Sequence, residues 1–197
     1  MSIDDAVERL TDTRDDINKW VGVYIGVLAV LLAICNVGGA NAVKDAGRAN
    51  LDAANTWAFF QAKNIRRTAV AMAADELELQ LMAQPSIPPA ARQAFDAKIK
   101  DYRATVQKLT TDPEKKEGLD ELFAKGKALE AERDVAMRRD PYFDWSQALL
   151  QIAIVLASVH LIIGNLTLLG LSGGLAGLGV LLMLNGFTLA LRLPLLG

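Results

Sequence analysis

The chain has 197 residues but only one cysteine, Cys35, and one histidine, His160. A single cysteine cannot form an intrachain disulfide or a cysteine-based metal cluster. A single histidine excludes the paired-histidine motif of zinc proteases, and no Cys/His nucleophile arrangement is present. We therefore expect no catalytic residue, no metal site and no bound cofactor, and a protein that is not an enzyme.

Phosphate-binding motifs and a basic surface are also lacking. The glycine-rich stretch from Gly170 to Gly179 lies inside an apolar run, so it is not a phosphate-binding loop. Lysine and arginine total 21 against 23 aspartate and glutamate residues, without the basic clustering that nucleic-acid binding requires. We therefore exclude nucleic acid as a partner.

Two long stretches of the chain contain no Asp, Glu, Lys or Arg. Val21 to Val43 has 23 residues, and Trp145 to Leu191 has 47. A helix that crosses a membrane needs about 20 apolar residues, so the first stretch predicts one span and the second predicts two. We expect transmembrane helices at residues 20–43, 145–164 and 170–191.

The flanks of these spans carry boundary signals. An acidic tail, residues 1–19, precedes the first span, and a short tail, residues 192–197, follows the third. Ala40-Asn41-Ala42 is similar to a signal-peptide cleavage site, but the apolar run exceeds the usual 7–15 residues, so we interpret it as an anchor. Asp140-Pro141 predicts a helix start before the second span, with the next aromatic residues at the depth of the membrane interface.

The turn between the second and third spans has two candidate positions. Glycine and small polar residues occur at Gly164-Asn165 and again at Ser172-Gly173. Both pairs are typical of turns, and both remain open. Arg192 and Pro194 are expected to end the third span.

Residues 44–144 lie between the first two spans and are rich in helix-forming residues. Prolines between Gln84 and Ala90 predict a tip at 85–89, which divides the segment into arms 44–84 and 89–139. These arms are about 60 and 75 Å long at 1.5 Å per residue, so two arms return the chain to the membrane. The predicted fold is therefore an all-α membrane protein. Three transmembrane helices carry a long extramembrane antiparallel helical hairpin, coiled-coil-like, between the first and second, with a break at Asp112-Pro113.

Apolar residues recur along both arms with alternating steps of three and four. This spacing is typical of coiled-coil packing and predicts the contact between the arms. In the first arm the pattern comprises Ala58, Ala62, Ile65, Ala69 and Met72. In the second arm it comprises Phe95, Ile99, Tyr102, Val106, Leu109, Leu119, Leu122, Gly126 and Leu129.

Three aromatic residues, Trp57, Phe59 and Phe60, stand inside the charged first arm. At 100° per residue, Trp57 and Phe60 share one helix face and Phe59 points roughly opposite. The hairpin covers only one face, so Phe59 predicts contact with another subunit or an unknown protein partner. Equal counts from the two membrane spans place Gly126, to within one helical turn, opposite Trp57.

Small residues on the spans predict close packing between membrane helices, and hence a homo-oligomer. Gly170, Gly173, Gly174 and Gly177 fall on one helix face at i, i+3, i+4 and i+7. Gly22 and Gly26 form a weaker patch of the same kind on the first span.

Polar residues within the spans are functional candidates by default. Asn36, His160 and Asn185 either form structural hydrogen bonds or line a pore that handles ions or protons. No charged partner lies in any predicted span, which favours the structural interpretation. At the membrane surface, Arg138 and Arg139 predict contact with lipid phosphate, so membrane lipids are expected partners.

Four segments together resemble a bacterial membrane-protein family, domain of unknown function family 4337. The resemblance covers Asn18 to Pro194 and is carried by WAFFQAKNIRR (57–67), RRDPYFDW (138–145), LLQIAIVLAS (149–158) and LLMLNGFTLALRLP (181–194). It implies a multi-pass protein of the bacterial inner membrane and no particular activity. Basic residues that family members often carry between the second and third spans imply an extracytoplasmic hairpin, although this chain has none there. The total count of basic residues near the spans favours the opposite side.

Three functions fit these observations. The first is a non-enzymatic homo-oligomeric scaffold or assembly protein that projects helical hairpins from the membrane. The second is an ion or proton channel, or a conduit resembling the TolQ-like stator subunits, with Asn36, His160 and Asn185 in its pore. The third is a sensory membrane protein, similar to chemoreceptor input domains, that needs a separate output partner.

Overall fold

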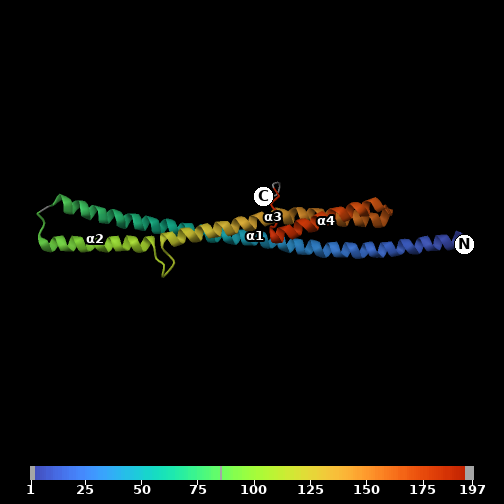
Figure 1. Ribbon diagram of the computed structural model, residues 1–197, viewed down its shortest axis with the longest axis horizontal. Helices are drawn as coiled ribbons and strands as arrows, with labels where there is room; N and C mark the ends of the chain where they lie inside the picture. Colours follow the sequence, from blue (N-terminus) through green and yellow to red (C-terminus); the bar gives the residue numbers. More distant parts are fainter. Residues whose placement is uncertain (1–2, 85, 194–197) are drawn as a thin grey trace. The chain divides into compact units, whose positions relative to one another are not determined.

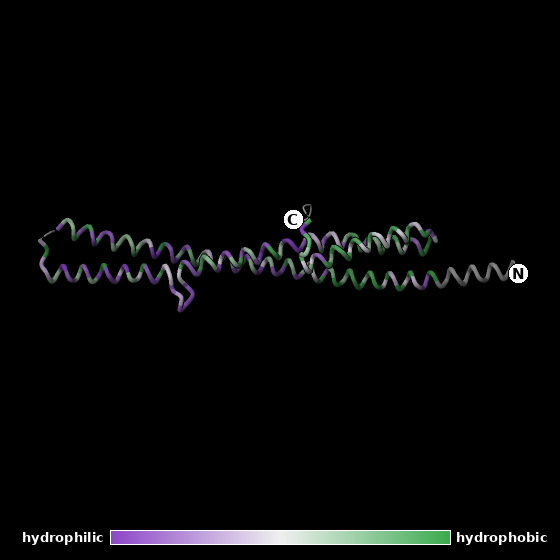
Figure 2. Tube along the Cα trace, viewed as in Figure 1, coloured by the Kyte–Doolittle hydropathy of each residue, from purple (hydrophilic) through white to green (hydrophobic). Residues whose placement is uncertain are grey.

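The computed structural model describes residues 3–84 and 86–193, with side chains from Ile17 onward. Four helices make up the described chain (Figure 1): α1 Ile3–Ala83, α2 Pro89–Thr110, α3 Leu119–Ile163 and α4 Leu166–Thr188. Helices α1, α3 and α4 are each long and apolar enough to cross a membrane, which confirms an all-helical chain with three candidate spans. Figure 2 shows hydrophobic residues along nearly all of α4 and a mixture of polar and apolar residues along α2.

The helices form two compact units. The first, called here the apolar unit, comprises Met1–Ala46 and Asp134–Gly197 and contains α4 with the uncharged parts of α1 and α3. The second, called the charged unit, comprises Gly47–Arg133. Helix α1 begins at Ile3, so the acidic tail predicted at 1–19 is helical where the structure describes it. Of the tail predicted at 192–197, residues 194–197 lie outside the described part.

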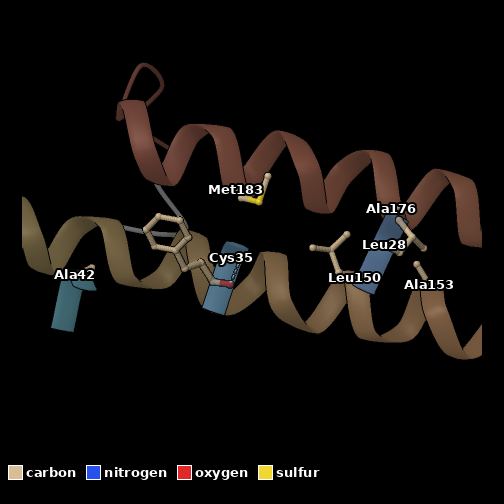
Figure 3. Packing of buried hydrophobic residues seen from close by; sticks show 8 residues of the cluster. Leu28, Cys35, Ala42, Leu150, Ala153, Ala176 and Met183 are labelled. Atoms are coloured by element: carbon tan, nitrogen blue, oxygen red, sulfur yellow. Dashed lines mark hydrogen bonds between the residues drawn. The ribbon is translucent and has the colours of Figure 1, made fainter. Parts of the chain in front are cut away.

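Hydroxyl groups join the helices of the apolar unit. Ser146 Oγ on α3 donates to the carbonyl of Gly179 on α4 at 2.7 Å. Ser172 Oγ on α4 donates to the carbonyl of Ala153 at 2.7 Å and lies 3.1 Å from the hydroxyl of Tyr24 on α1. In an apolar environment such bonds between helices supplement close van der Waals packing. Buried residues from all three helices meet between them (Figure 3): Leu28, Cys35, Ala42, Phe143, Leu150, Ala153, Ala176 and Met183.

Phe143 is one of the largest fully buried side chains and lies among glycines. A Cβ on Gly38 would lie 2.5 Å from Phe143 Cε1, and a Cβ on Gly186 would lie 3.1 Å from the same ring. The ring also packs edge-on against Phe187, with 4.9 Å between centroids. Tyr142 and Phe143, predicted at the depth of the membrane interface, are both buried within the chain.

The predicted helix start at Asp140-Pro141 is also wrong. Helix α3 runs from Leu119 to Ile163 with Pro141 in its interior. Proline inside a helix costs about 3 kcal/mol because it removes a hydrogen bond and crowds the preceding turn. Burial of Tyr142 and Phe143 directly after Pro141 offsets this cost, so tertiary packing overrides the local signal.

The turn between α3 and α4 lies at Gly164-Asn165, and Ser172-Gly173 is inside α4. Gly164 has a φ of 73°, which glycine adopts without strain, and the Asn165 side chain accepts from Thr167 N. Helix α4 therefore begins at Leu166 rather than at 170. It ends at Thr188 rather than at 191, because Leu189 takes a left-handed conformation.

Helix α2 ends at Thr110 and α3 begins at Leu119, so the second arm is interrupted near Asp112-Pro113. Helix α3 begins six residues after Pro113, so Asp112-Pro113 breaks the arm without starting the next helix. Carboxylates from the first turn of α3 bind the end of α2 instead: Asp120 accepts from the Thr111 hydroxyl at 2.8 Å, and Glu121 accepts from Asp112 N at 3.2 Å. These bonds hold 111–118 as an irregular connection.

The charged unit packs α1 antiparallel to α2 and the start of α3. Residue pairs in contact run in opposite directions, from Trp57 with Phe123 to Asp75 with Arg103. The predicted second-arm pattern faces inward, since none of its nine residues is exposed. The predicted first-arm pattern is wrong, because all five of its residues are exposed. The buried face of α1, with four buried and six half-buried residues, comprises instead Ala49, Ala53, Thr56, Phe60, Lys63, Arg67, Val70, Ala74, Leu77 and Leu81.

Candidate functional site

The aromatic cluster is the most concentrated packing site of the charged unit. Trp57 makes edge-to-face contacts with Phe60, at 5.6 Å between ring centroids, and with Phe123 on α3, at 5.5 Å. Such aromatic pairs contribute about 0.5–1.5 kcal/mol each beyond the area they bury. Phe123 was not singled out from the sequence, although it lies one residue after a member of the predicted second-arm pattern.

Gly126 lies directly against Trp57. A Cβ at this position would lie 2.8 Å from the ring atoms Cε2 and Cζ2, closer than real Cβ contacts permit. The counting argument therefore placed the correct residue opposite the indole. Only glycine allows the ring to approach α3 this closely.

Trp57 also has a polar partner that the sequence analysis missed. Its Nε1 donates to Glu130 Oε1 at 3.0 Å, and Lys127 Nζ donates to the other carboxylate oxygen at 2.9 Å. The hydrogen bond from Lys127, followed by the one from Trp57, lowers the pKa of Glu130 below its ordinary value. Gly126 and Glu130 are four residues apart and share a face of α3, a spacing that could have identified the pair.

Phe59 points away from this cluster. Its side chain is 46% exposed, while Trp57 and Phe60 are half-buried. Lys63 Nζ lies 5.3 Å from the centre of the Phe59 ring and also donates to the carbonyl of Glu117. Phe59 is therefore an apolar surface that its own chain leaves uncovered.

A charged cluster lies elsewhere in the same unit. Arg103 Nη2 donates to Asp75 Oδ1 at 2.6 Å and to Glu78 Oε1 at 2.9 Å. These bonds, from Glu78 first and Asp75 second, raise the pKa of the Arg103 guanidinium. All three side chains are largely exposed, so the cluster fixes the register of α2 on α1 more than it adds stability.

The predicted glycine patches are open. A Cβ on any of these residues would meet nothing within 4 Å: Gly22, Gly26, Gly170, Gly173, Gly174 and Gly177. The glycines that the apolar unit uses internally are different, and the sequence analysis did not select them: Gly38, Gly39, Gly179 and Gly186.

His160 lies at the end of α3 and is only 3% exposed. Its Nδ1 is 2.9 Å from the carbonyl of Asn165, and its own carbonyl accepts from Gly164 N at 2.7 Å. The imidazole therefore closes the turn between α3 and α4. One ring nitrogen of His160 is therefore occupied by a local backbone contact.

Asn185 closes the other end of α4. Its side-chain amide donates to the carbonyl of Leu191 at 2.8 Å, and its side-chain oxygen accepts from Leu191 N at 2.8 Å. The Tyr142 hydroxyl donates to the same carbonyl at 3.1 Å and accepts from Leu193 N at 3.1 Å. Asn36, on α1, is exposed. The structure therefore does not bring Asn36, His160 and Asn185 together within one chain.

Arg138 and Arg139 lie on α3 just before Tyr142. Arg138 and Arg192 line a small cavity of about 60 Å³ together with Tyr142, Leu189 and Leu191. Arg139 Nε is the buried side-chain nitrogen without a hydrogen-bond partner among the described residues. Guanidinium groups in this position suit an anionic oxygen such as that of a lipid phosphate.

The described residues contain no group of three or more His, Cys, Asp or Glu side chains that could hold a metal ion.

The chain belongs to the protein family described as Domain of unknown function (DUF4337), whose model matches residues 17–189. Comparison with curated proteins and with solved structures gave no match.

Proposed function

We propose that this family member is a non-enzymatic homo-oligomeric scaffold of the bacterial inner membrane. In this proposal α1, α3 and α4 cross the membrane and the charged unit projects from it as an antiparallel helical hairpin. The support is the distribution of charge: the uncharged stretches, Val21 to Val43 and Trp145 to Leu191, lie in the apolar unit, and the charged unit carries most of the ionisable residues.

The open glycine face of α4 is the main observation in support of a homo-oligomer. Gly170, Gly173, Gly174 and Gly177 share one side of α4, and nothing of the same chain lies within 4 Å of the positions their Cβ atoms would take. The opposite side of α4, with Ser172, Ala176, Gly179 and Met183, is buried against the other helices. In lipid, helices associate mainly through close contact at small residues, so the open side suits a helix of a second copy.

The mass of the purified protein tests this proposal. In detergent or lipid nanodiscs, we expect native mass spectrometry to find a defined oligomer that Gly173→Leu weakens. Leu171→Phe is the matched control, because it adds bulk at an exposed position about 60° or more around the helix from each glycine. A wild-type chain that is monomeric at all concentrations would overturn the proposal.

The conduit alternative receives less support. His160 and Asn185 close opposite ends of α4 and use their hydrogen-bonding groups locally. A pore would need these groups to face a common axis. In the scaffold proposal, His160 and Asn185 hold the two ends of α4 in place.

A further inference from the structure

Helix α1 carries a second, mostly apolar pattern on the face that its own chain leaves uncovered. The exposed residues of this face recur with alternating steps of four and three, and we call them the exposed stripe: Leu51, Asn55, Ala58, Ala62, Ile65, Ala69, Met72, Glu76 and Leu79. Each lies two residues after a member of the buried face. Two residues correspond to about 200° of rotation, so the two patterns occupy opposite sides of one helix.

The large apolar members of the exposed stripe are strongly solvent-exposed. Ile65 is 71% exposed, and Leu51 and Leu79 are each 66% exposed. Isolated exposed apolar residues need no explanation, but a pattern sustained over about four heptads does. Spacing of 3.5 residues per repeat is the signature of packing against another helix of similar periodicity.

We propose that the exposed stripe of α1 packs in parallel and in register against the same stripe of a second copy of this chain. This inference rests on the proposed function, because insertion in one membrane gives every copy the same orientation. Parallel α1 helices then bring identical residues together. Ala58, Ala62 and Ala69 form small layers, which allow the backbones to approach closely, and Ile65 and Met72 form larger layers between and beyond them.

Asn55 is the uncharged polar member of the stripe, and it fits a second copy in register. The steps of four and three place it at the a position of a heptad whose d position is Ala58. A single asparagine at an a position specifies register and oligomeric state, because its amide can bond to the same amide of the partner helix. Asn55 is exposed in its own chain, so its side chain is accessible to that partner.

The residues flanking the stripe also fit a parallel partner. In a parallel coiled coil, the residue directly before an a position faces the residue five positions later on the other helix. Gln61 then faces Arg66 of the second copy, and Ala54 faces Phe59. None of the pairs between 54 and 80 brings like charges together, and the exposed ring of Phe59 gains a cover.

Glu76 is the one charged member of the stripe. In register, its carboxylate would meet that of the second copy, which opposes association because like charges repel. A stripe with one charged layer is weaker than one without it, so removal of this charge gives a gain-of-association test. Glu76 also has a long hydrogen bond from Gln80 at 3.4 Å, on the same helix.

Cysteine cross-linking locates the interface. In a Cys35→Ala background, Ala62→Cys should form a disulfide-linked dimer on oxidation in membranes. The matched control is Ala124→Cys, an exposed alanine on α3 next to Phe123, which should remain monomeric on a non-reducing gel. Both positions are exposed in the folded chain, so neither substitution disturbs its core.

Glu76→Leu supplies an independent measurement. We expect it to tighten self-association about tenfold in a dilution series, while Ala62→Asp weakens it without lowering the thermal stability of the monomer. If the protein is oligomeric but Ala62→Cys fails to cross-link, or cross-links no better than Ala124→Cys, the exposed stripe is not the interface. The scaffold proposal would be unaffected by that result. A monomeric wild-type protein would overturn both.

Discussion

The indole of Trp57 lies over Gly126 and donates from Nε1 to the carboxylate of Glu130, one turn further along α3. One side chain thus fixes both the distance between the helices and their register. The glycine permits the close approach, and the hydrogen bond at 3.0 Å selects one alignment. The charged unit depends on this pair of contacts more than on its exposed ion pairs.

A larger side chain at position 126 should disrupt this packing. Gly126→Leu places a branched side chain where a Cβ would already lie 2.8 Å from Trp57. Overpacking of this kind costs about 1–3 kcal/mol, so the thermal unfolding midpoint followed by circular dichroism should fall. Ala124→Leu, at an exposed position of the same helix, should leave the midpoint nearly unchanged. Equal midpoints for both variants would contradict the structure.

Acid should weaken the contact between Trp57 and Glu130. Hydrogen bonds from Lys127 and Trp57 lower the folded-state pKa of Glu130 relative to the unfolded chain. A group with a lowered pKa stabilises the fold above its unfolded value and loses that contribution as pH falls through the folded value. Between about pH 6 and pH 3, the wild-type midpoint should therefore fall more steeply than that of Glu130→Gln. Parallel curves would show that Glu130 does not couple to unfolding.

The glycines around Phe143 should tolerate no side chain. A Cβ at Gly38 would lie 2.5 Å from Phe143 and 2.9 Å from Phe187. Gly38→Ala should destabilise the apolar unit by about 1–3 kcal/mol. Cys35 is fully buried, so a thiol-reactive dye reports opening of this unit without any added label. Labelling should accelerate in Gly38→Ala and not in Gly26→Ala, whose Cβ would meet nothing within 4 Å.

Asn185 should hold the end of the described chain in place. Asn185→Ala removes two hydrogen bonds of 2.8 Å to Leu191, each contributing about 1 kcal/mol. Amide hydrogen exchange at Leu191 should accelerate roughly tenfold or more, measured by mass spectrometry in nanodiscs. Asn36→Ala, at an exposed position of α1, serves as the control. Unchanged exchange at Leu191, together with altered ion flux, would favour the conduit instead.

The side of the membrane on which the charged unit lies can be measured at its tip. Ser86 is exposed in the connection between α1 and α2. In a Cys35→Ala background, we expect Ser86→Cys to react with a membrane-impermeant maleimide added to intact spheroplasts. Labelling only after the membrane is opened would place the charged unit in the cytoplasm.

Features set by chain length and by strong local signals were predictable. Run lengths without charge indicated three candidate spans, and α1 ends at Ala83 and α2 begins at Pro89, on either side of the proline-rich tip. Proline lacks the N–H that continues a helix, so such clusters act locally. The pairing of Trp57 with Gly126 followed, to within one turn, from equal distances to the two membrane spans, since helical rise is constant.

Features that depend on competition between signals were not predictable. Pro141 starts a helix by local rules, yet α3 continues through it because the aromatic residues that follow are buried. Glycines on an obvious helix face, such as Gly173, are open within the chain, while Gly38 and Gly186 receive Phe143. A glycine is in close contact only where a large aromatic ring from another helix packs against it.

In helix α1 the sequence predicts the helix, and tertiary packing decides which of its faces is buried. Its sequence shows one apolar pattern with steps of three and four, from Ala58 to Met72, and a mixed pattern with the same steps on the opposite face. Periodicity cannot tell which face packs against the rest of the chain, because apolar residues with the same spacing occur on both. Packing ranks them: Phe60 lies inward, where it meets Phe123 on α3, and Ile65 and Met72 remain exposed. Shape complementarity between distant segments decides the choice, and it exists only once the chain has folded.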